Sequence, residues 1–273
     1  MKNILLLSDF SSNSKNAIHY AMRFFENENC TFHLMHVHKI RSFVSDDLMH
    51  APKESVYESI TKVPRDKLNS IAQILKDTYK NEKHQFEIHI DFDVFTDAIK
   101  QAVINNDIDF IVMGTNGISG AKEVLFGSNT INVIRKVNCK TLAIPEGYTF
   151  SPIKELLLSL NPRDRIDGKH YTDLLEFMEA YQLNLHVLRV NPNNENQEVE
   201  KEDRAALSIL TCKYHVVNGV PMDFALLSYL QTNPVDVLAL FAKKESALEH
   251  FFLQKNSRMS IAKMPKPVFV LHG

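Results

Sequence analysis

The sequence is poor in cysteine, in long apolar runs and in net charge. Its three cysteines, Cys30, Cys139 and Cys212, are too few and too scattered for a disulfide framework, which favours a reducing compartment. No stretch approaches the ~18 apolar residues of a membrane span. The apolar run that follows Asn3 ends after four residues, too short for the core of a signal peptide. We therefore expect a soluble, cytoplasmic protein.

The charges are almost balanced, with 31 Lys and Arg against 33 Asp and Glu and a formal net charge of −2. Such a chain has no bulk positive field to hold a nucleic acid or an anionic membrane, so we expect neither as a partner. With 273 residues, of which 44% are apolar, the composition is that of a globular protein with room for two domains.

The two halves of the sequence resemble each other. Residues 109–144 align without a gap with residues 236–271, at a shift of 127 positions. We predict a degenerate tandem duplication, in which the second copy has lost a segment after its second strand. The shorter matches near the start of each half, at shifts of 151 and 150, are Leu5–Ser8 with Leu156–Ser159 and His36–Val37 with His186–Val187.

Each copy predicts an open α/β sheet. Short, almost continuously apolar runs alternate with helical patterns, as in a doubly wound parallel sheet that helices cover on both faces. Gly147–Pro152 has the composition of a linker, so we predict one domain over residues 1–147 and a second over 148–273. The strands expected in the first copy are 3–8, 31–37, 86–91, 110–114 and 140–144. Of the four helices expected there, the first begins after Ser11 or Ser12, the second spans 63–79, the third spans about 97–103, and the fourth follows Ser128.

The most informative residues follow the fourth expected strand. Glycine is scarce, yet four of the eight glycines fall between Gly114 and Gly127. A glycine at the end of a strand lets the chain turn, and a second lets a ligand approach the backbone without a Cβ clash. Gly127 and Ser128 then open a helix, whose free N–H groups and dipole favour a phosphate. The spacing suits a nucleotide, although glycines that serve chain reversal alone would leave the same pattern. It is neither the dinucleotide fingerprint nor a P-loop.

With these residues the chain resembles a tandem universal stress protein. Nucleotide-binding members of that family carry G-x-x-G, nine residues and then G-[ST] after the fourth strand, and Gly114, Gly117, Gly127 and Ser128 match every defined place. The opening Ile4–Ser11 is similar to the family's first strand. The resemblance implies a Rossmann-like strand order of 3-2-1-4-5 in each copy. It also implies that the fifth strands pair across a twofold, with the second domain acting as a built-in pseudo-dimer partner.

The resemblance further implies an adenine nucleotide, ATP, ADP or AMP, held with Mg²⁺ by the first copy. Asp9 and Val37 would border the adenine and ribose, and the start of the fourth helix would receive the phosphates. Asp9 also ends the first strand at the edge where open sheets bind ligands, although it could instead cap the next helix. The implied binding residues are Ser8, Asp9, Val37, Met113, Gly114, Asn116, Gly117, Gly127, Ser128, Asn129 and Thr130.

The second copy lacks this pattern. At shifts of 127 and 151, Phe241 takes the place of Gly114, and Leu160 takes that of Asp9. A phenylalanine would fill the space that the glycine leaves open, so we predict that the second copy does not bind nucleotide in this way. The other replacements are Lys244, Gln254 and Lys255 for Gly117, Gly127 and Ser128.

Two other features have simpler interpretations. His36 and His38 share one face of a strand, but no carboxylate or cysteine completes a ligand set by sequence spacing, and His33, His84 and His89 fare no better, so we predict no metal site. The polar segment 42–57 is interpreted as a solvated loop, with a lid over the binding edge as the alternative.

Known catalytic patterns are missing. The sequence has no G-x-S-x-G, no H-E-x-x-H and no kinase signature, so it offers no dedicated catalytic residue. We expect an ATP-binding stress-response regulator and not an enzyme, with slow hydrolysis left open because a positioned water would suffice. The alternative is an interaction module that does not need nucleotide, in which the glycine loop is a relic.

Overall fold

The computed structural model describes residues 1–38, 53–115, 126–192, 197–242 and 266–273. In this part of the chain the short apolar runs form strands, and the amphipathic segments between them form helices. The strands are β1 (Lys2–Leu7), β2 (Cys30–Val37), β3 (His84–Asp91), β4 (Phe110–Gly114), β5 (Lys140–Ile144), β6 (Glu155–Leu160), β7 (Asn184–Asn191), β8 (Cys212–Asn218), β9 (Val237–Phe241) and β10 (Val268–Leu271). The helices are α1 (Ser12–Phe24), α2 (Lys53–Tyr79), α3 (Phe95–Asn105), α4 (Ser128–Lys136), α5 (Gly168–Tyr181), α6 (Gln197–Ala206) and α7 (Met222–Thr232).

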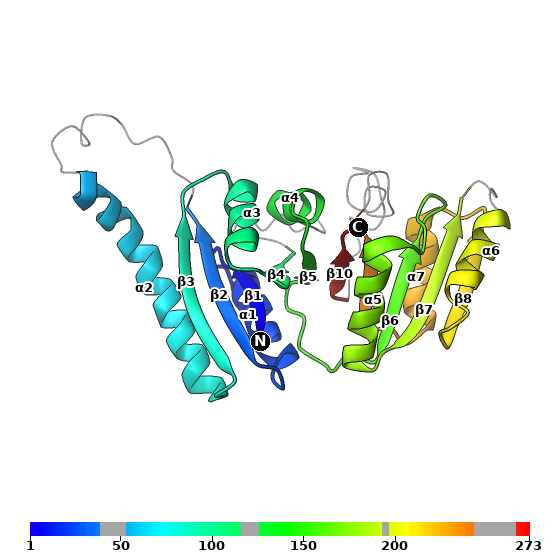
Figure 1. The fold of residues 1–273 in the computed structure, drawn as a ribbon, viewed down its shortest axis with the longest axis horizontal. Helices are drawn as coiled ribbons and strands as arrows, with labels where there is room; N and C mark the ends of the chain where they lie inside the picture. Colours follow the sequence, from blue (N-terminus) through cyan, green and yellow to red (C-terminus); the bar gives the residue numbers. More distant parts are fainter. Residues whose placement is uncertain (39–52, 116–125, 193–196, 243–265) are drawn as a thin grey trace.

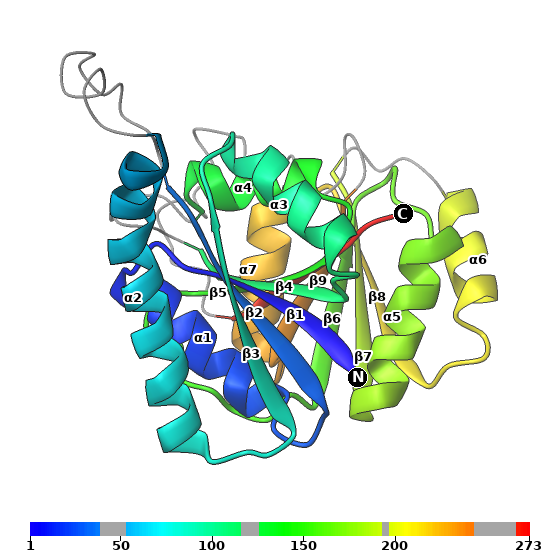
Figure 2. The same ribbon diagram turned by 60° about the vertical axis from the view of Figure 1, so that its left-hand side comes forward.

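These strands form one continuous sheet in the order β3-β2-β1-β4-β5-β10-β9-β6-β7-β8 (Figure 1). Each half has the order 3-2-1-4-5, and neighbouring strands within a half are parallel. Buried side chains of α1, α2 and α5 pack on one face of the sheet, and those of α3, α4 and α7 pack on the other. Figure 2 shows α1 beside α2, and α3 beside α4, in the first half. The predicted fold class, two tandem doubly wound sheets, is confirmed.

Helix α2 begins ten residues before the expected start at Val63 and continues through Pro64. Proline lacks the N–H that would bond the carbonyl four residues earlier, so inside a helix it removes one hydrogen bond, and here it does not end the helix. Residues 53–57 of the predicted loop are therefore helical, and the loop interpretation is wrong for them. Residues 42–52 of that segment lie outside the described residues.

The two halves meet where β5 and β10 pair antiparallel. Leu142 lies opposite Phe269, and Ala143 lies opposite Val268. The ring of Phe269 also stacks on Phe110 of β4, with 6.1 Å between the ring centroids. The predicted pairing of the fifth strands is confirmed, and it leaves neither β5 nor β10 as an open edge among the described strands.

The sheet register corrects the alignment of the first strands of the two halves. Ile4 lies opposite Phe110 in β4, and Leu156 lies opposite Val237 in β9. Phe110 and Val237 are counterparts at the shift of 127, so Leu156 is the counterpart of Ile4 at a shift of 152, and the predicted shift of 151 is wrong. A run of leucines hides a slip of one residue in the sequence, whereas in a sheet such a slip turns every side chain to the other face.

The second strands are also aligned differently from the prediction. Phe32 in β2 lies opposite Ile4, and Leu185 in β7 lies opposite Leu156. Because Ile4 and Leu156 are counterparts, Phe32 and Leu185 are counterparts as well. It follows that His186 corresponds to His33, and the predicted match of His186 with His36 is wrong. A two-residue match was too short to define the register of a strand.

Candidate functional site

The predicted binding residues lie along one edge of the first half, where β1, β2 and β4 end and α4 begins. Because β1 and β4 are neighbours and their connections run to opposite sides of the sheet, this edge is a switch point of the kind at which open α/β sheets bind ligands. Asn116 and Gly117 lie outside the described residues. Ser8 and Asp9 follow β1, Val37 ends β2, Met113 and Gly114 end β4, and Gly127, Ser128, Asn129 and Thr130 stand at the start of α4.

The turn after β1 is organised by Asp9. One carboxylate oxygen of Asp9 accepts hydrogen bonds from the backbone N–H of Ser11, at 3.0 Å, and from its hydroxyl, at 2.5 Å. Ser11 in turn caps α1 by accepting from the N–H of Ser14 at 3.1 Å. The helix cap is therefore Ser11, one of the two serines predicted for this role, and not Asp9. Asp9 holds the capping residue and stays half-buried at the edge of the sheet.

His36 fixes the end of β1 against β2. Its Nδ1 donates to the carbonyl oxygen of Ser8 at 2.8 Å, while the backbone N–H of Ser8 donates to Met35 at 2.9 Å. Burial lowers the pKa of His36, although the bond to Ser8 opposes the effect, so the ring is neutral at pH 7 with its proton on Nδ1. The position of Ser8 and Asp9 is thus set from the neighbouring strand.

Gly114 lets the end of β4 lie against the start of α1. A Cβ at this position would meet Nδ2 of the buried Asn13 at 2.7 Å and its Cγ at 2.8 Å. The φ of Gly114 lies outside the left-handed region, so the backbone conformation does not require glycine. The prediction that Gly114 is needed for a sharp turn is therefore wrong. The structure shows instead that a glycine is needed here because β4 and α1 pack closely together.

Gly114→Ala is expected to lower the free energy of unfolding by about 1–3 kcal/mol, the usual cost of overpacking. Urea unfolding measures the change, and the loss should shrink when the same substitution is made beside Asn13→Ala, which removes the atoms that clash. Gly147→Asn is the control, since no described atom lies within 4 Å of a Cβ there and asparagine tolerates its φ of +70°. A Gly114→Ala protein as stable as the wild type would contradict the packing role.

Helix α4 is anchored to β4 and begins at a glycine N-cap, which has no side chain to cap it. The hydroxyl of Thr130, 3% exposed, lies 3.1 Å from the carbonyl oxygens of both Gly114 and Thr115, to which it donates. Thr130 therefore positions the helix, and its hydroxyl is already engaged. Gly127 is the N-cap residue, and no side-chain bond from it caps the described helix. The first turn thus presents Ser128 and Asn129 at the surface.

Met113 and Val37 form an apolar wall on the face that α3 and α4 cover. Met113 is buried and Val37 is half-buried, and both belong to the cluster that includes Ile99 of α3 and Val133 of α4. They can line an aromatic or aliphatic part of a ligand, but their side chains offer it no strong hydrogen bond.

The corresponding edge of the second half is closed by a buried arginine. By the register of the sheet, the counterpart of Asp9 is Asn161, so the predicted Leu160 is wrong. Asn161 makes the same kind of turn, because its Oδ1 accepts from the N–H two residues on at 2.8 Å. The guanidinium of Arg189 donates to the carbonyl oxygens of Asn161 and Asp164. It also donates twice to Asp203 of α6, at 2.6 and 2.8 Å.

Phe241 occupies the position of Gly114 in the second half. It is fully buried and packs edge-on against His170, with 4.2 Å between the ring centroids. Sequence reasoning found Phe241 but missed Arg189 and Asp203. The available signal was an arginine in the apolar strand that spans residues 184–191. Lys244, Gln254 and Lys255 lie outside the described residues.

Comparison with known proteins decides the family. The family model described as "Universal stress protein family" matches residues 1–145, about half of the chain. The chain belongs to the universal stress protein family. A search of curated protein sequences gives no match.

Solved structures show that the fold extends over the whole chain. A universal stress protein from Archaeoglobus fulgidus DSM 4304 is 18% identical, with a TM-score of 0.65 over 99% of this chain and 96% of that one. A putative universal stress protein from Pseudomonas aeruginosa UCBPP-PA14 is 14% identical, with a TM-score of 0.58 over 100% and 93% of the two chains. The cytoplasmic domain of a prokaryotic cation chloride cotransporter is 12% identical, with a TM-score of 0.56 over 99% and 95%.

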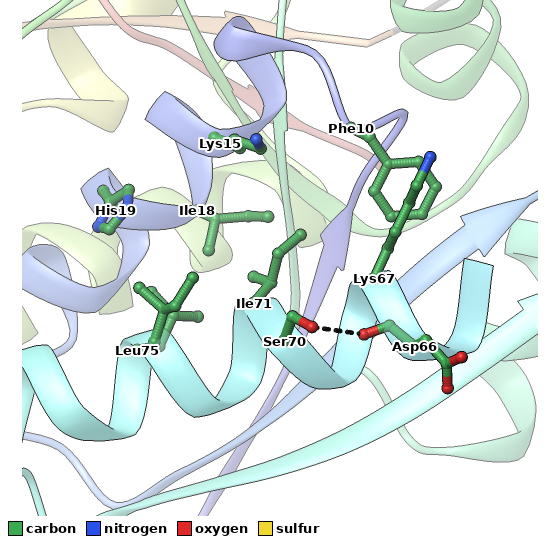
Figure 3. Close-up of a pocket in the computed structure, with 10 residues that line it drawn as sticks. Phe10, Lys15, Ile18, His19, Asp66, Lys67, Ser70, Ile71 and Leu75 are labelled. Atoms are coloured by element: carbon green, nitrogen blue, oxygen red, sulfur yellow. Dashed lines mark hydrogen bonds between the residues drawn. The ribbon is translucent and has the colours of Figure 1, made fainter. Parts of the chain in front are cut away.

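This universal stress protein also has a cavity of about 490 Å³ between α1 and α2 (Figure 3). Ile18, Ile71 and Leu75 supply apolar walls, and the Lys67 ammonium lies 5.1 Å from the centre of the Phe10 ring. None of the described residues predicted to bind a ligand lines this cavity. Among the described helices, none is long and apolar enough to cross a membrane.

Proposed function

We propose that this universal stress protein is a cytoplasmic stress-response regulator whose first half binds an adenine nucleotide, ATP, ADP or AMP, with Mg²⁺. The observation that carries the proposal is the start of α4. Its N-cap residue is a glycine, so no N-cap side chain occupies the first turn, which lies next to the end of β4 and at the switch point that Asp9 borders. Uncapped N–H groups and the positive end of the helix dipole favour a phosphate.

The residues of this edge suit the separate parts of a nucleotide. Val37 and Met113 offer an apolar wall for a base. The Asp9 carboxylate, half-buried at the end of β1, can accept hydrogen bonds from a ribose or an amine. The hydroxyl of Ser128 and the amide of Asn129 lie at the surface of the first turn of α4, where phosphates and Mg²⁺ would be held.

The second half serves, in this proposal, as a fixed pseudo-dimer partner that does not bind nucleotide at the corresponding edge. Arg189 and Phe241 occupy that edge and are both buried. We further propose that the protein binds its ligand without dedicated catalysis, since its sequence carries no G-x-S-x-G, no H-E-x-x-H and no kinase signature.

Calorimetry and thermal unfolding of the nucleotide-free chain test this function. Mg-ATP, Mg-ADP and Mg-AMP are titrated separately, with Mg²⁺ alone as the blank. We expect saturable binding of one nucleotide per chain, and a ligand at 100 times its Kd should stabilise the native state by about 2.7 kcal/mol. If no nucleotide gives a heat of binding or a shift in melting temperature, the alternative of an interaction module that does not need nucleotide is favoured. Release of phosphate well above the background rate would point instead to an enzyme.

A further inference from the structure

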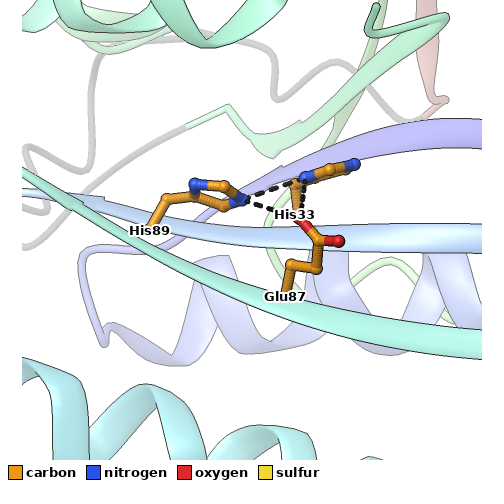
Figure 4. Close-up of side chains that lie close together, drawn as sticks. All are labelled: His33, Glu87 and His89. Atoms are coloured by element: carbon orange, nitrogen blue, oxygen red, sulfur yellow. Dashed lines mark hydrogen bonds and ion pairs between the residues drawn. The ribbon is translucent and has the colours of Figure 1, made fainter. Parts of the chain in front are cut away.

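Three side chains converge on one face at the β3 edge of the sheet (Figure 4). His33 comes from β2, and Glu87 and His89 come from β3. In the register of these strands Glu87 lies directly opposite His33, while His89, two residues on, shares the same face. The sequence could not show this set, because His33 and Glu87 are 54 positions apart and only strand pairing joins them.

The three nearest donor atoms form a triangle of the size that a small metal ion requires. Nδ1 of His33 lies 2.9 Å from Nε2 of His89 and 3.3 Å from Oε2 of Glu87, and the last two atoms are 3.6 Å apart. Zinc binds nitrogen and oxygen at about 2.0–2.1 Å, so ligand atoms at the corners of a tetrahedron lie about 3.3 Å apart. The observed distances lie on both sides of that value.

The burial and exposure of the three groups also suit a metal. His33 is 4% exposed, and its Nε2 has no hydrogen-bond partner in the described structure, so its only polar contacts are within this cluster. Glu87 is 55% exposed, which leaves a side open to solvent.

The second half provides an internal comparison. The counterparts of His33, Glu87 and His89 are His186, Lys213 and His215, from the pairing of β7 with β8. Both histidines are retained, but the carboxylate is replaced by an ammonium that lies 3.4 Å from Nε2 of His186. A positive charge at this place excludes a cation, and His186 pairs with Glu155 at 2.8 Å instead.

We propose that His33, Glu87 and His89 form a binding site for a divalent transition-metal ion of the zinc type, with water as the fourth ligand. Two imidazoles and one carboxylate suit zinc, cobalt or nickel better than magnesium or calcium, which prefer oxygen ligands. The open position toward solvent is typical of a site that exchanges its metal or binds a further ligand. This site is separate from the edge proposed for nucleotide and does not depend on it.

Titration of the full chain, stripped of metal with a chelator, tests the site with Zn²⁺ as the probe. Calorimetry should show Zn²⁺ binding that His89→Ala and Glu87→Gln each weaken at least about 10-fold. Co²⁺ should give the visible absorption of a tetrahedral complex, which Zn²⁺ displaces. Glu87→Lys, which places the residue of the second half in the first, should abolish both signals.

His215→Ala is the matched control, because it removes the counterpart histidine in the second half and should leave Zn²⁺ affinity unchanged. The melting temperature without metal shows whether each variant is folded, and Glu87→Gln keeps the shape of the side chain. The proposal is overturned if the wild type shows no saturable Zn²⁺ binding. It is equally overturned if Glu87→Lys binds as tightly as the wild type, or if His215→Ala causes the same loss as His89→Ala.

Discussion

Replacing Arg189 with alanine is expected to lower the free energy of unfolding by about 3–5 kcal/mol. The side chains of Arg189 and Asp203 are each 1% exposed, so the truncation leaves the Asp203 carboxylate buried without its counter-charge. The hydroxyl of Tyr214 still donates to that carboxylate at 2.7 Å, but a neutral donor does not balance the charge. Two backbone carbonyls also lose their donor. Urea unfolding followed by circular dichroism measures the loss.

Two further variants test whether stability is lost because the buried ion pair is broken, and not simply because an arginine is removed. Arg204→Ala removes an exposed guanidinium on the same helix as Asp203, where it pairs with Glu200, and should change stability far less. The double variant Arg189→Met with Asp203→Leu replaces both charges by apolar groups and should recover most of the stability. If Arg189→Ala lowers the free energy of unfolding no more than Arg204→Ala does, the buried pair of Arg189 and Asp203 does not stabilise the fold in the way described.

Gly127→Val is expected to weaken the binding of Mg-ATP by at least about 100-fold, or about 2.7 kcal/mol. This prediction rests on the proposed function. A branched side chain at the N-cap of α4 would stand where the phosphates are proposed to approach the first turn of the helix. The backbone at Gly127 has φ −63° and ψ 156°, which valine adopts readily, so the fold should be retained. Calorimetry measures the affinity, and thermal unfolding without ligand reports the stability.

The matched control is Asp167→Val, which places the same residue at the N-cap of α5 in the second half. No side-chain capping bond is made by Asp167 in the described helix, so both substitutions place valine at an N-cap without removing such a bond; the carboxylate of Asp167 does lie 3.7 Å from Nε2 of His170. Asp167→Val should leave Mg-ATP affinity unchanged. Undiminished affinity in Gly127→Val would mean that the phosphates bind elsewhere in the protein.

Local patterns in the sequence were enough to predict the architecture. Apolar runs and helical spacing predicted the order of strands and helices in the first half, and the internal repeat extended it to the second. These patterns could not predict the register of the strands, that is, which residues of neighbouring strands lie opposite each other. Leu156 follows a glutamate and opens a run of three leucines, so a slip of one residue changes little in the sequence, although it reverses the two faces of the strand.

The candidate site was predicted in the same uneven way. Residues close together in the sequence, such as Gly127 and Ser128, were proposed as candidates from their spacing, and Asp9 from its place after a strand; the structure brings them to one edge of the sheet. Interactions that depend on packing between elements were not visible, because no spacing reveals them. The contact of Gly114 with Asn13, the hydroxyl of Thr130 on β4, and the approach of Glu87 to His33 all belong to this second kind.

The antiparallel pairing of β5 with β10 has a consequence for how the two halves could diverge. In a symmetric dimer of identical chains every substitution occurs twice, and a residue near the axis must be compatible with itself. Here Leu142 faces Phe269 and Thr141 faces Val270, so each position has a partner that mutates separately. Joining the halves in one chain therefore removes the requirement that they stay alike. The second half could therefore acquire a buried arginine at the edge that corresponds to the candidate nucleotide site, while the contact between β5 and β10 was kept.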